Sequence, residues 1–181
     1  MEKIIVIGIS GAGKSVLSRK IGRKLQLPVY HLDAFFHLPG GEMLNRDAFV
    51  AQQEDMMTTD QWLIDGNYAG TLPMRLAQAD TVIWLDFPAK LNTLRVIKRS
   101  WQFSQDKSTR PDMPDFFEEQ MFDKAYWQFL KFVWTFNKKV RPYIVSTLEN
   151  RPKTAKLIIL KNRRQVTKFM AKLRKLKKER V

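Results

Sequence analysis

One stretch of eight residues, Gly8-Ile9-Ser10-Gly11-Ala12-Gly13-Lys14-Ser15, constrains the fold more than any other part of the chain. It fits the pattern G-x-x-x-x-G-K-[S/T]. A β-branched run at 3–7 predicts a buried strand before it, and apolar residues at helical spacing predict a helix after it. Because this context separates a genuine phosphate-binding loop from a chance match, we predict that the loop holds a polyphosphate.

The residue types in this loop suit phosphate binding. The glycines let the backbone curl around a phosphate, so that several N–H groups point inward at an anion. The positive end of the helix that begins at Lys14 adds to this attraction. We expect Lys14 to reach the β- and γ-phosphates of ATP and Ser15 to offer its hydroxyl to Mg²⁺. The predicted nucleotide-binding residues of the loop are Gly8, Ser10, Gly11, Ala12, Gly13, Lys14, Ser15 and Val16.

Strands and helices alternate over the first half of the chain, which is typical of an α/β fold with a parallel sheet. The predicted strands are 3–8, 29–32, 62–65, 81–86 and 156–160, and the predicted helices in the first half are 14–26, 46–59 and 73–79. A length of 181 residues fits one domain, 1–181. Within it we expect 89–150 to form a helical lid or insert.

The region 89–150 has a pattern of its own. Its first helix carries an apolar face formed by Leu91, Leu94, Ile97 and Trp101. The segment 104–114 is polar and lacks periodicity, which predicts a mobile loop. The following stretch, 116–136, is dense in aromatic residues and predicts a helix that is apolar over much of its circumference. Core packing, base stacking and a dimer interface all remain open for it.

Cysteine is absent from the sequence, which excludes disulfides, thiolate metal sites and a cysteine nucleophile. No apolar run approaches the ~20 residues of a membrane span. The N-terminus leads directly into the first predicted strand, so it does not resemble a signal peptide. We therefore expect a cytoplasmic enzyme with no membrane partner, while the pattern of residues leaves the oligomeric state open.

The net charge of +14 is unevenly distributed along the chain. Residues 1–90 hold nine basic and ten acidic residues, so all of the excess lies in 91–181. A predicted C-terminal helix at 164–178 is rich in lysine on one face, including Lys172, Lys175 and Lys178. Either a polyanionic partner such as nucleic acid, or solubility together with phosphate-binding arginines, accounts for this asymmetry.

Two aspartates follow predicted strands, Asp33 after the second and Asp65 at the end of the third. In an open parallel sheet the ligand crevice lies at the carboxyl ends of the strands, so both carboxylates are expected near the phosphates. Either could orient Mg²⁺ or accept a proton from an acceptor hydroxyl. The alternative is a turn or capping role. A third aspartate, Asp86, ends another predicted strand, and the neighbouring Pro88 favours a turn role for it. His31 is expected to line the crevice or pack.

Three arginines are candidates for a lid over the phosphates. Arg95 and Arg99 are four residues apart, so they share a helix face, and Arg110 ends the polar segment. Phosphoryl transfer needs cations that neutralise developing charge and a lid that excludes water. The alternative is that all three are ordinary surface charges.

The residues described so far resemble adenylate-kinase-type nucleoside and nucleotide kinases. Finer features, namely His31-Leu32-Asp33, Asp65-Gly66-Asn67-Tyr68, Ala79-Asp80-Thr81 and Thr109-Arg110-Pro111-Asp112, resemble bacterial DNA topology modulation proteins. The resemblance implies a three-layer α/β/α P-loop NTPase fold, strand order 2-3-1-4-5 and a small helical lid. It also implies ATP and Mg²⁺ as cofactors, with Arg95 near the base and with Arg99 and Arg110 reaching phosphates.

The chain departs from this family at the acceptor side. Nucleotide monophosphate kinases follow Asp-Gly with Phe-Pro-Arg, whose arginine grips the acceptor phosphate, whereas Asn67-Tyr68-Ala69 stands here. The nearest arginine is Arg75, so the acceptor need not be a nucleoside monophosphate. The residues predicted to bind the acceptor are Asp33, Asp65, Gly66, Asn67, Tyr68 and Arg75.

Together these features predict an ATP-dependent phosphotransferase acting on a small acceptor, with a nucleoside or nucleotide as one option. Lys14, Asp33, Arg99 and Arg110 are the predicted catalytic residues, and Ser15 and Asp65 the predicted magnesium residues. The alternative is a nucleic-acid-binding ATPase that modulates DNA topology. A degenerate nucleotide-binding protein is a third reading, against which the intact Lys14 and Ser15 argue.

Overall fold

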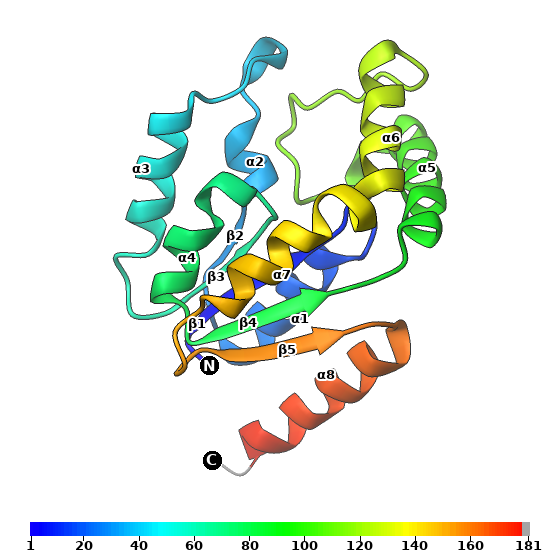
Figure 1. Cartoon of the computed structure of the whole chain (residues 1–181). Coiled ribbons are helices and arrows are strands. Elements are labelled where there is room, and N and C mark those ends of the chain that lie inside the picture. The colour runs from blue at the N-terminus through cyan, green and yellow to red at the C-terminus, as the bar shows by residue number, and fades with distance from the viewer. Residues whose placement is uncertain (179–181) are drawn as a thin grey trace.

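The computed structural model describes the backbone of residues 1–178 and the side chains of residues 1–173 (Figure 1). The side chains of Lys175 and Lys178, singled out in the sequence, therefore lie outside the described residues. In chain order the elements are β1 Lys3–Gly8, α1 Lys14–Leu25, β2 Val29–His31, α2 Leu32–Phe36, α3 Arg46–Met56, β3 Trp62–Asp65, α4 Leu72–Gln78, β4 Thr81–Leu85, α5 Ala89–Gln105, α6 Lys124–Lys139, α7 Arg141–Glu149, β5 Lys156–Leu160 and α8 Arg163–Lys178, with short 3₁₀ segments at Pro39–Gly41, Ala69–Thr71 and Lys107–Thr109.

The five strands form one parallel sheet in the order β2-β3-β1-β4-β5, as predicted. The central strands β1, β3 and β4 are buried almost throughout, because helices cover both faces of the sheet. This explains why their sequences are continuous apolar runs rather than alternating ones. The carboxyl ends of β1, β2 and β3 meet at one edge, where the sequence predicts a binding site.

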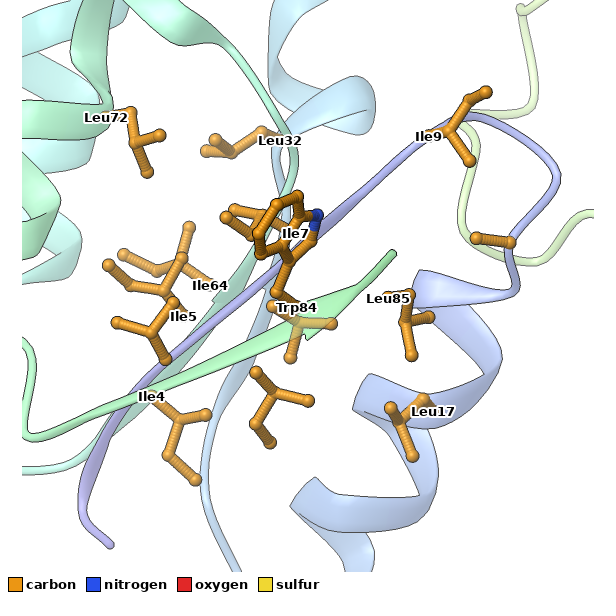
Figure 2. Close-up of a cluster of buried hydrophobic side chains, with 14 of the residues drawn as sticks. Ile4, Ile5, Ile7, Ile9, Leu17, Leu32, Ile64, Leu72, Trp84 and Leu85 are labelled. Atoms are coloured by element: carbon orange, nitrogen blue, oxygen red, sulfur yellow. The ribbon is translucent and has the colours of Figure 1, made fainter. Parts of the chain in front are cut away.

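Neighbouring residues of β4 show how the two faces are covered. The ring of Trp84 lies against the Arg141 guanidinium at the start of α7, 5.3 Å from centroid to Cζ. Leu85 points to the other face, toward Leu17 of α1, as Figure 2 shows. The helices α1 and α8 line a groove on the face of Leu85, while α4 packs against α7. The core thus forms two apolar layers with the sheet between them.

The apolar face of α5 formed by Leu91, Leu94, Ile97 and Trp101 is exposed, and the buried face holds Asn92, Thr93, Val96, Ser100 and Phe103. One expectation about 89–150 is wrong. The helix predicted at 116–136 begins only at Lys124, since the Asp123 side chain caps it by accepting a hydrogen bond from the Tyr126 amide at 2.6 Å. Within the described residues, no helix is long and apolar enough to cross a membrane.

Candidate active site

The loop 8–15 has the conformation that its glycines predict. Gly8, Gly11 and Gly13 all have positive φ, and α1 begins at Lys14 directly after them. The Lys14 Nζ atom donates hydrogen bonds to the Gly8 and Ile9 carbonyl oxygens, at 2.9 and 3.4 Å. Burial lowers the pKa of Lys14, and this lowering is opposed by the nearby carboxylates of Asp33 and Asp65. The ammonium group is thus held inside the loop, among the residues predicted to bind phosphate.

Gly11 also joins the loop to α5. A Cβ atom built at this position would lie 2.6 Å from the Asn92 carbonyl oxygen, so only glycine fits against the helix. Asn92 itself is fully buried, and its side-chain amide donates to the Pro88 carbonyl at 3.0 Å. This contact seats the first turns of α5 on the phosphate loop, so the helix that carries Arg95 and Arg99 is fixed relative to Lys14.

Two carboxylates lie beside the loop, Asp65 at the end of β3 and Asp33 in the first turn of α2 just after β2, and each has a partner. The Tyr68 hydroxyl donates to Asp33 Oδ1 at 2.8 Å. The His31 Nδ1 atom lies 2.6 Å from Asp65 Oδ2, and the two residues are register partners on β2 and β3. Both carboxylates contribute to the electrostatic environment of Lys14. The strand-end prediction for Asp33 and Asp65 therefore agrees with their position, and their partners were not foreseen.

The segment 66–68, predicted to bind the acceptor, contacts the phosphate loop and the strand before it. The Asn67 Oδ1 atom accepts a hydrogen bond from the Gly8 amide at 2.8 Å. Gly66, with φ of +144°, donates its amide to the Val6 carbonyl at 3.1 Å. Asn67 therefore holds the start of the loop rather than standing free toward an acceptor.

Arg75 corrects a prediction. Its side chain is 0% exposed, and the guanidinium donates to the carbonyl oxygens of Gly66, Asn67 and Tyr68 at 3.0, 2.9 and 3.2 Å. Burial lowers the pKa of Arg75 to about 9, opposed by Tyr68 and Asp65. A guanidinium enclosed in this way supports the backbone of residues 66–68 and is not exposed to a ligand.

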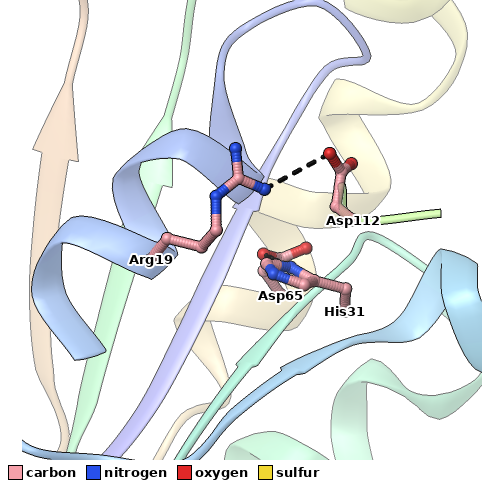
Figure 3. A network of polar contacts seen from close by, with 4 residues as sticks. All are labelled: Arg19, His31, Asp65 and Asp112. Atoms are coloured by element: carbon pink, nitrogen blue, oxygen red, sulfur yellow. Dashed lines mark hydrogen bonds and ion pairs between the residues drawn. The ribbon is translucent and has the colours of Figure 1, made fainter. Parts of the chain in front are cut away.

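The segment 106–123 packs beside the phosphate loop through Asp112 and Arg19, two residues for which the sequence predicted no role. Asp112 Oδ1 lies 3.3 Å from the Arg19 Nη1 atom of α1, above the His31–Asp65 pair, as Figure 3 shows. Burial raises the pKa of Asp112, but Arg110, the Ser15 hydroxyl and Arg19 outweigh it and hold the pKa low. A signal existed for Arg19, since it follows Ser15 by four residues and so shares its helix face.

Arg110 occupies a confined position in the same segment. It is 7% exposed, its Cζ atom lies 5.5 and 5.1 Å from the ring centroids of Phe103 and Phe117, and it pairs with Glu119 at 3.6 Å. Burial and the like charge of Arg99 lower the pKa of Arg110. Within the described part of the chain, the Nε atoms of both arginines are buried without a hydrogen-bond partner. Such unsatisfied donors suit an anionic ligand.

Arg95 lies next to Phe87, one of the residues that line a groove between α1 and α8. Its Cζ atom is 5.5 Å from the Phe87 ring centroid. Burial lowers the pKa of Arg95, and the like charge of Arg163 lowers it further. The groove has a volume of about 910 Å³ and includes Gly13 and Val16 of the phosphate loop. This is a suitable place for the base and ribose of a nucleotide whose phosphates lie in the loop.

The residues present fit ATP and magnesium. The space beside Gly13 is open, since a Cβ atom built there would meet nothing within 4 Å. Lys14 supplies a buried cation in the same loop. Among the described side chains there is no group of three histidine or acidic residues that could hold a metal alone. Magnesium would therefore be held by the Ser15 hydroxyl together with ligand phosphates, and Asp65 is already paired with His31.

Asp86 differs from the other strand-end aspartates. Its two carboxylate oxygens accept hydrogen bonds from Nε and Nη2 of Arg141, both at 2.9 Å. This bidentate pair ties the end of β4 to α7. Pro88 had suggested a turn role for Asp86, whereas the geometry shows an ion pair between the end of β4 and α7.

The sheet order, the glycine loop and the helix that follows it define a P-loop kinase fold. A search of solved structures finds this fold in shikimate kinase from Bacteroides thetaiotaomicron, with a TM-score of 0.59, 14% identity and 97% of each chain covered. Shikimate kinase from Acinetobacter baumannii, solved in complex with shikimate, has a TM-score of 0.56 at 16% identity, covering 99% of this chain and 94% of that one. No protein-family model matches the sequence, and no curated protein matches it either. The resemblance to DNA topology modulation proteins thus has no counterpart in these comparisons.

Proposed function

We propose that this protein is a phosphotransferase that moves the γ-phosphate of ATP to a hydroxyl group of a small molecule. The observation that carries the proposal is the position of Asp33. This carboxylate lies in the first turn of α2, just after β2, where it affects the pKa of the buried Lys14, and its Oδ1 atom accepts a hydrogen bond from the Tyr68 hydroxyl. Its other oxygen is the one available to an acceptor hydroxyl.

In this mechanism the protein mainly positions groups and neutralises charge. The loop amides and Lys14 hold the transferring phosphate, and Arg99 and Arg110 stabilise the charge that develops on it. Asp33 orients the acceptor hydroxyl and accepts its proton as the new P–O bond forms and the bond from the γ-phosphorus to the bridging oxygen breaks, releasing ADP. When bound at Ser15, Mg²⁺ neutralises phosphate charge.

The segment 106–123 acts as the lid in this proposal. Asp112 pairs with Arg19 of α1, the helix that follows the phosphate loop, and the Phe117 ring centroid lies 5.0 Å from that of His37 on the acceptor side. A segment that contacts both sides can exclude water from the transferring phosphate. The acceptor class agrees with the solved neighbour that holds shikimate, a small hydroxylated molecule.

The test is ADP release from ATP across a panel of nucleosides, nucleotides and small hydroxy compounds that includes shikimate, each with and without DNA. We expect one compound class to accelerate ADP release in the wild type. Replacing Lys14 with Ala should lower that rate by at least about a hundredfold. Undiminished turnover by the Lys14→Ala protein, or ADP release that no acceptor accelerates, would refute the proposal.

A nucleic-acid-binding ATPase is the second candidate, and one observation favours it. The groove beside the loop is bordered by Lys20, Arg23 and Lys24 of α1 and by Arg163 of α8. Such a basic border suits a phosphate backbone. Salt-dependent binding of duplex DNA that is lost when the three α1 residues are changed to Gln would support this candidate, and its absence near physiological salt would dismiss it.

A further inference from the structure

The outward surface of α5 and α6 is unusual for a protein in water. Leu94 and Trp101 of α5 are 66% and 58% exposed, and Trp127 and Trp134 of α6 are 57% and 53% exposed. Ile97 is also exposed, at 38%. Single exposed apolar side chains are common, but a contiguous set marks an interaction site. We call these five residues the α5/α6 face.

The two helices place this set on one surface. Lys90, Leu94, Ile97 and Trp101 recur at helical spacing along α5, and Trp127 and Trp134 are seven residues apart on α6. The helices lie beside each other at one edge of the molecule, as Figure 1 shows. The Lys90 Nζ atom lies 5.8 Å from the Trp134 ring centroid, which joins the two rows. The α5/α6 face is therefore continuous across the pair.

The charge of these helices has a single sign. Together α5 and α6 contain eight lysine and arginine residues and no aspartate or glutamate. Lys90, Lys98 and Lys131 are exposed within or beside the α5/α6 face. An apolar surface with tryptophans and a lysine border is complementary to the headgroup region of an anionic bilayer, where indole rings reside and lysines meet lipid phosphate.

From this complementarity we infer that the α5/α6 face docks the protein on an anionic membrane surface. A second copy of the chain is a poorer partner, because a symmetric contact would place these lysines against one another. Nucleic acid offers rings for the tryptophans but little for Leu94 and Ile97, whose aliphatic side chains gain from leaving water. The inference is independent of the proposed reaction and revises the expectation that the protein has no membrane partner.

Tryptophan fluorescence reports on this face directly. Of the five tryptophans, Trp62 and Trp84 are buried, so the exposed Trp101, Trp127 and Trp134 are the ones whose surroundings change on docking. The full-length protein is mixed with vesicles of phosphatidylglycerol and phosphatidylcholine, and separately with phosphatidylcholine alone, at about 0.15 M salt. We expect a blue shift and co-sedimentation with the anionic vesicles only.

Variants localise the contact. Leu94→Ser combined with Trp101→Ser should abolish co-sedimentation while leaving unfolding by urea cooperative, because both side chains are more than half exposed. Lys98→Gln combined with Lys131→Gln should lower the vesicle partition coefficient by roughly twenty-five-fold, about fivefold for each lysine. Lys168→Gln combined with Lys172→Gln removes the same charge from α8 and is the matched control.

Each result bears on the inference. Loss of binding in the two face variants, with retention in the α8 control, supports it. Failure of the wild type to bind anionic vesicles, or equal binding to both vesicle types, overturns it. It is likewise overturned if the α8 control loses binding as strongly as the face variants. Concentration-dependent self-association without lipid, removed by the Leu94 and Trp101 changes, would instead assign the face to a second copy.

Discussion

The Nδ1 atom of His31 lies 2.6 Å from the Oδ2 atom of Asp65, and this pair joins the ends of the adjacent strands β2 and β3. Burial by itself lowers the pKa of His31, but the hydrogen bond and charge of Asp65 outweigh it and raise the pKa. The pair therefore favours a protonated imidazole directly beneath Asp112 and beside the phosphate loop (Figure 3).

Replacing His31 with Asn should flatten the pH dependence of stability. A pKa raised by folding means that the native state binds more protons, so this contribution is complete below the unfolded pKa of about 6.5 and is lost as pH rises through the folded pKa. Urea unfolding from about pH 5 to pH 9 measures the slope. His37→Asn is the control. Burial lowers the pKa of His37, so replacing it should remove a contribution to stability that increases with pH. If the free energy of unfolding of the His31→Asn protein depends on pH as in the wild type, the raised pKa assigned to the His31–Asp65 pair is contradicted.

Replacing Arg75 with Met should destabilise the fold by roughly 3 kcal/mol, because three carbonyl oxygens of residues 66–68 lose a charged donor. Arg46→Met is the matched control, since Arg46 is exposed and its loss should cost about 0.5 kcal/mol or less. Urea denaturation measures both. Equal effects from the two variants would show that the buried guanidinium does not support the segment.

Gly11 and Gly13 provide a comparison of two positions with similar φ, +81° and +91°. Changing Gly13 to Ala should cost only the backbone strain of about 1 to 2 kcal/mol. Gly11→Ala should cost more, because its Cβ would also meet the Asn92 carbonyl oxygen at 2.6 Å. It should also weaken ATP binding by displacing the loop. Calorimetric ATP titration measures the affinity and thermal unfolding measures the stability. A larger loss of stability from Gly13→Ala than from Gly11→Ala would contradict the prediction.

Asp112 is expected to hold the segment 106–123 against α1. Changing it to Asn removes its pairing with Arg19, at a cost of about 1 kcal/mol, so tryptic cleavage after the exposed Lys107 should become roughly fivefold faster. Glu118→Gln removes the exposed pairing with Lys107 in the same segment and serves as the control. Its cleavage rate should barely change. Equal acceleration by both variants would contradict the claim that Asp112 holds the segment 106–123 against α1.

Much of the fold could be predicted because its signals are local. Strands β1, β3 and β5 have the predicted bounds, since each is an apolar run next to residues that favour turns. The strand order followed from the family resemblance. Which face of a helix is covered is a different matter, because periodicity shows that a face is apolar and not that another element packs on it. The face of Leu94 and Trp101 shows this, since the sequence marks it as apolar and the structure leaves it exposed.

The candidate site was predictable to a lesser degree. Strand ends place Asp33 and Asp65 by topology alone, and the loop motif places Lys14. The pairing of Asp112 with Arg19 joins residues 93 positions apart, and no spacing rule reaches that far. Arg75 was expected to face the acceptor because it is the nearest arginine, yet distance along the chain does not reveal that its side chain turns back to its own backbone.

The most direct test of the proposed transfer is detection of the phosphorylated acceptor by mass spectrometry in wild type, Asp33→Asn and Asp86→Asn proteins. Both variants neutralise a carboxylate near a strand end, but both oxygens of Asp86 are already engaged by Arg141. We expect Asp33→Asn to lower product formation by at least about a hundredfold, with unchanged ATP affinity, and Asp86→Asn to form product nearly as the wild type does. Wild-type rates with Asp33→Asn, or loss of product only with Asp86→Asn, would contradict the assignment of Asp33 as the residue that accepts the acceptor proton.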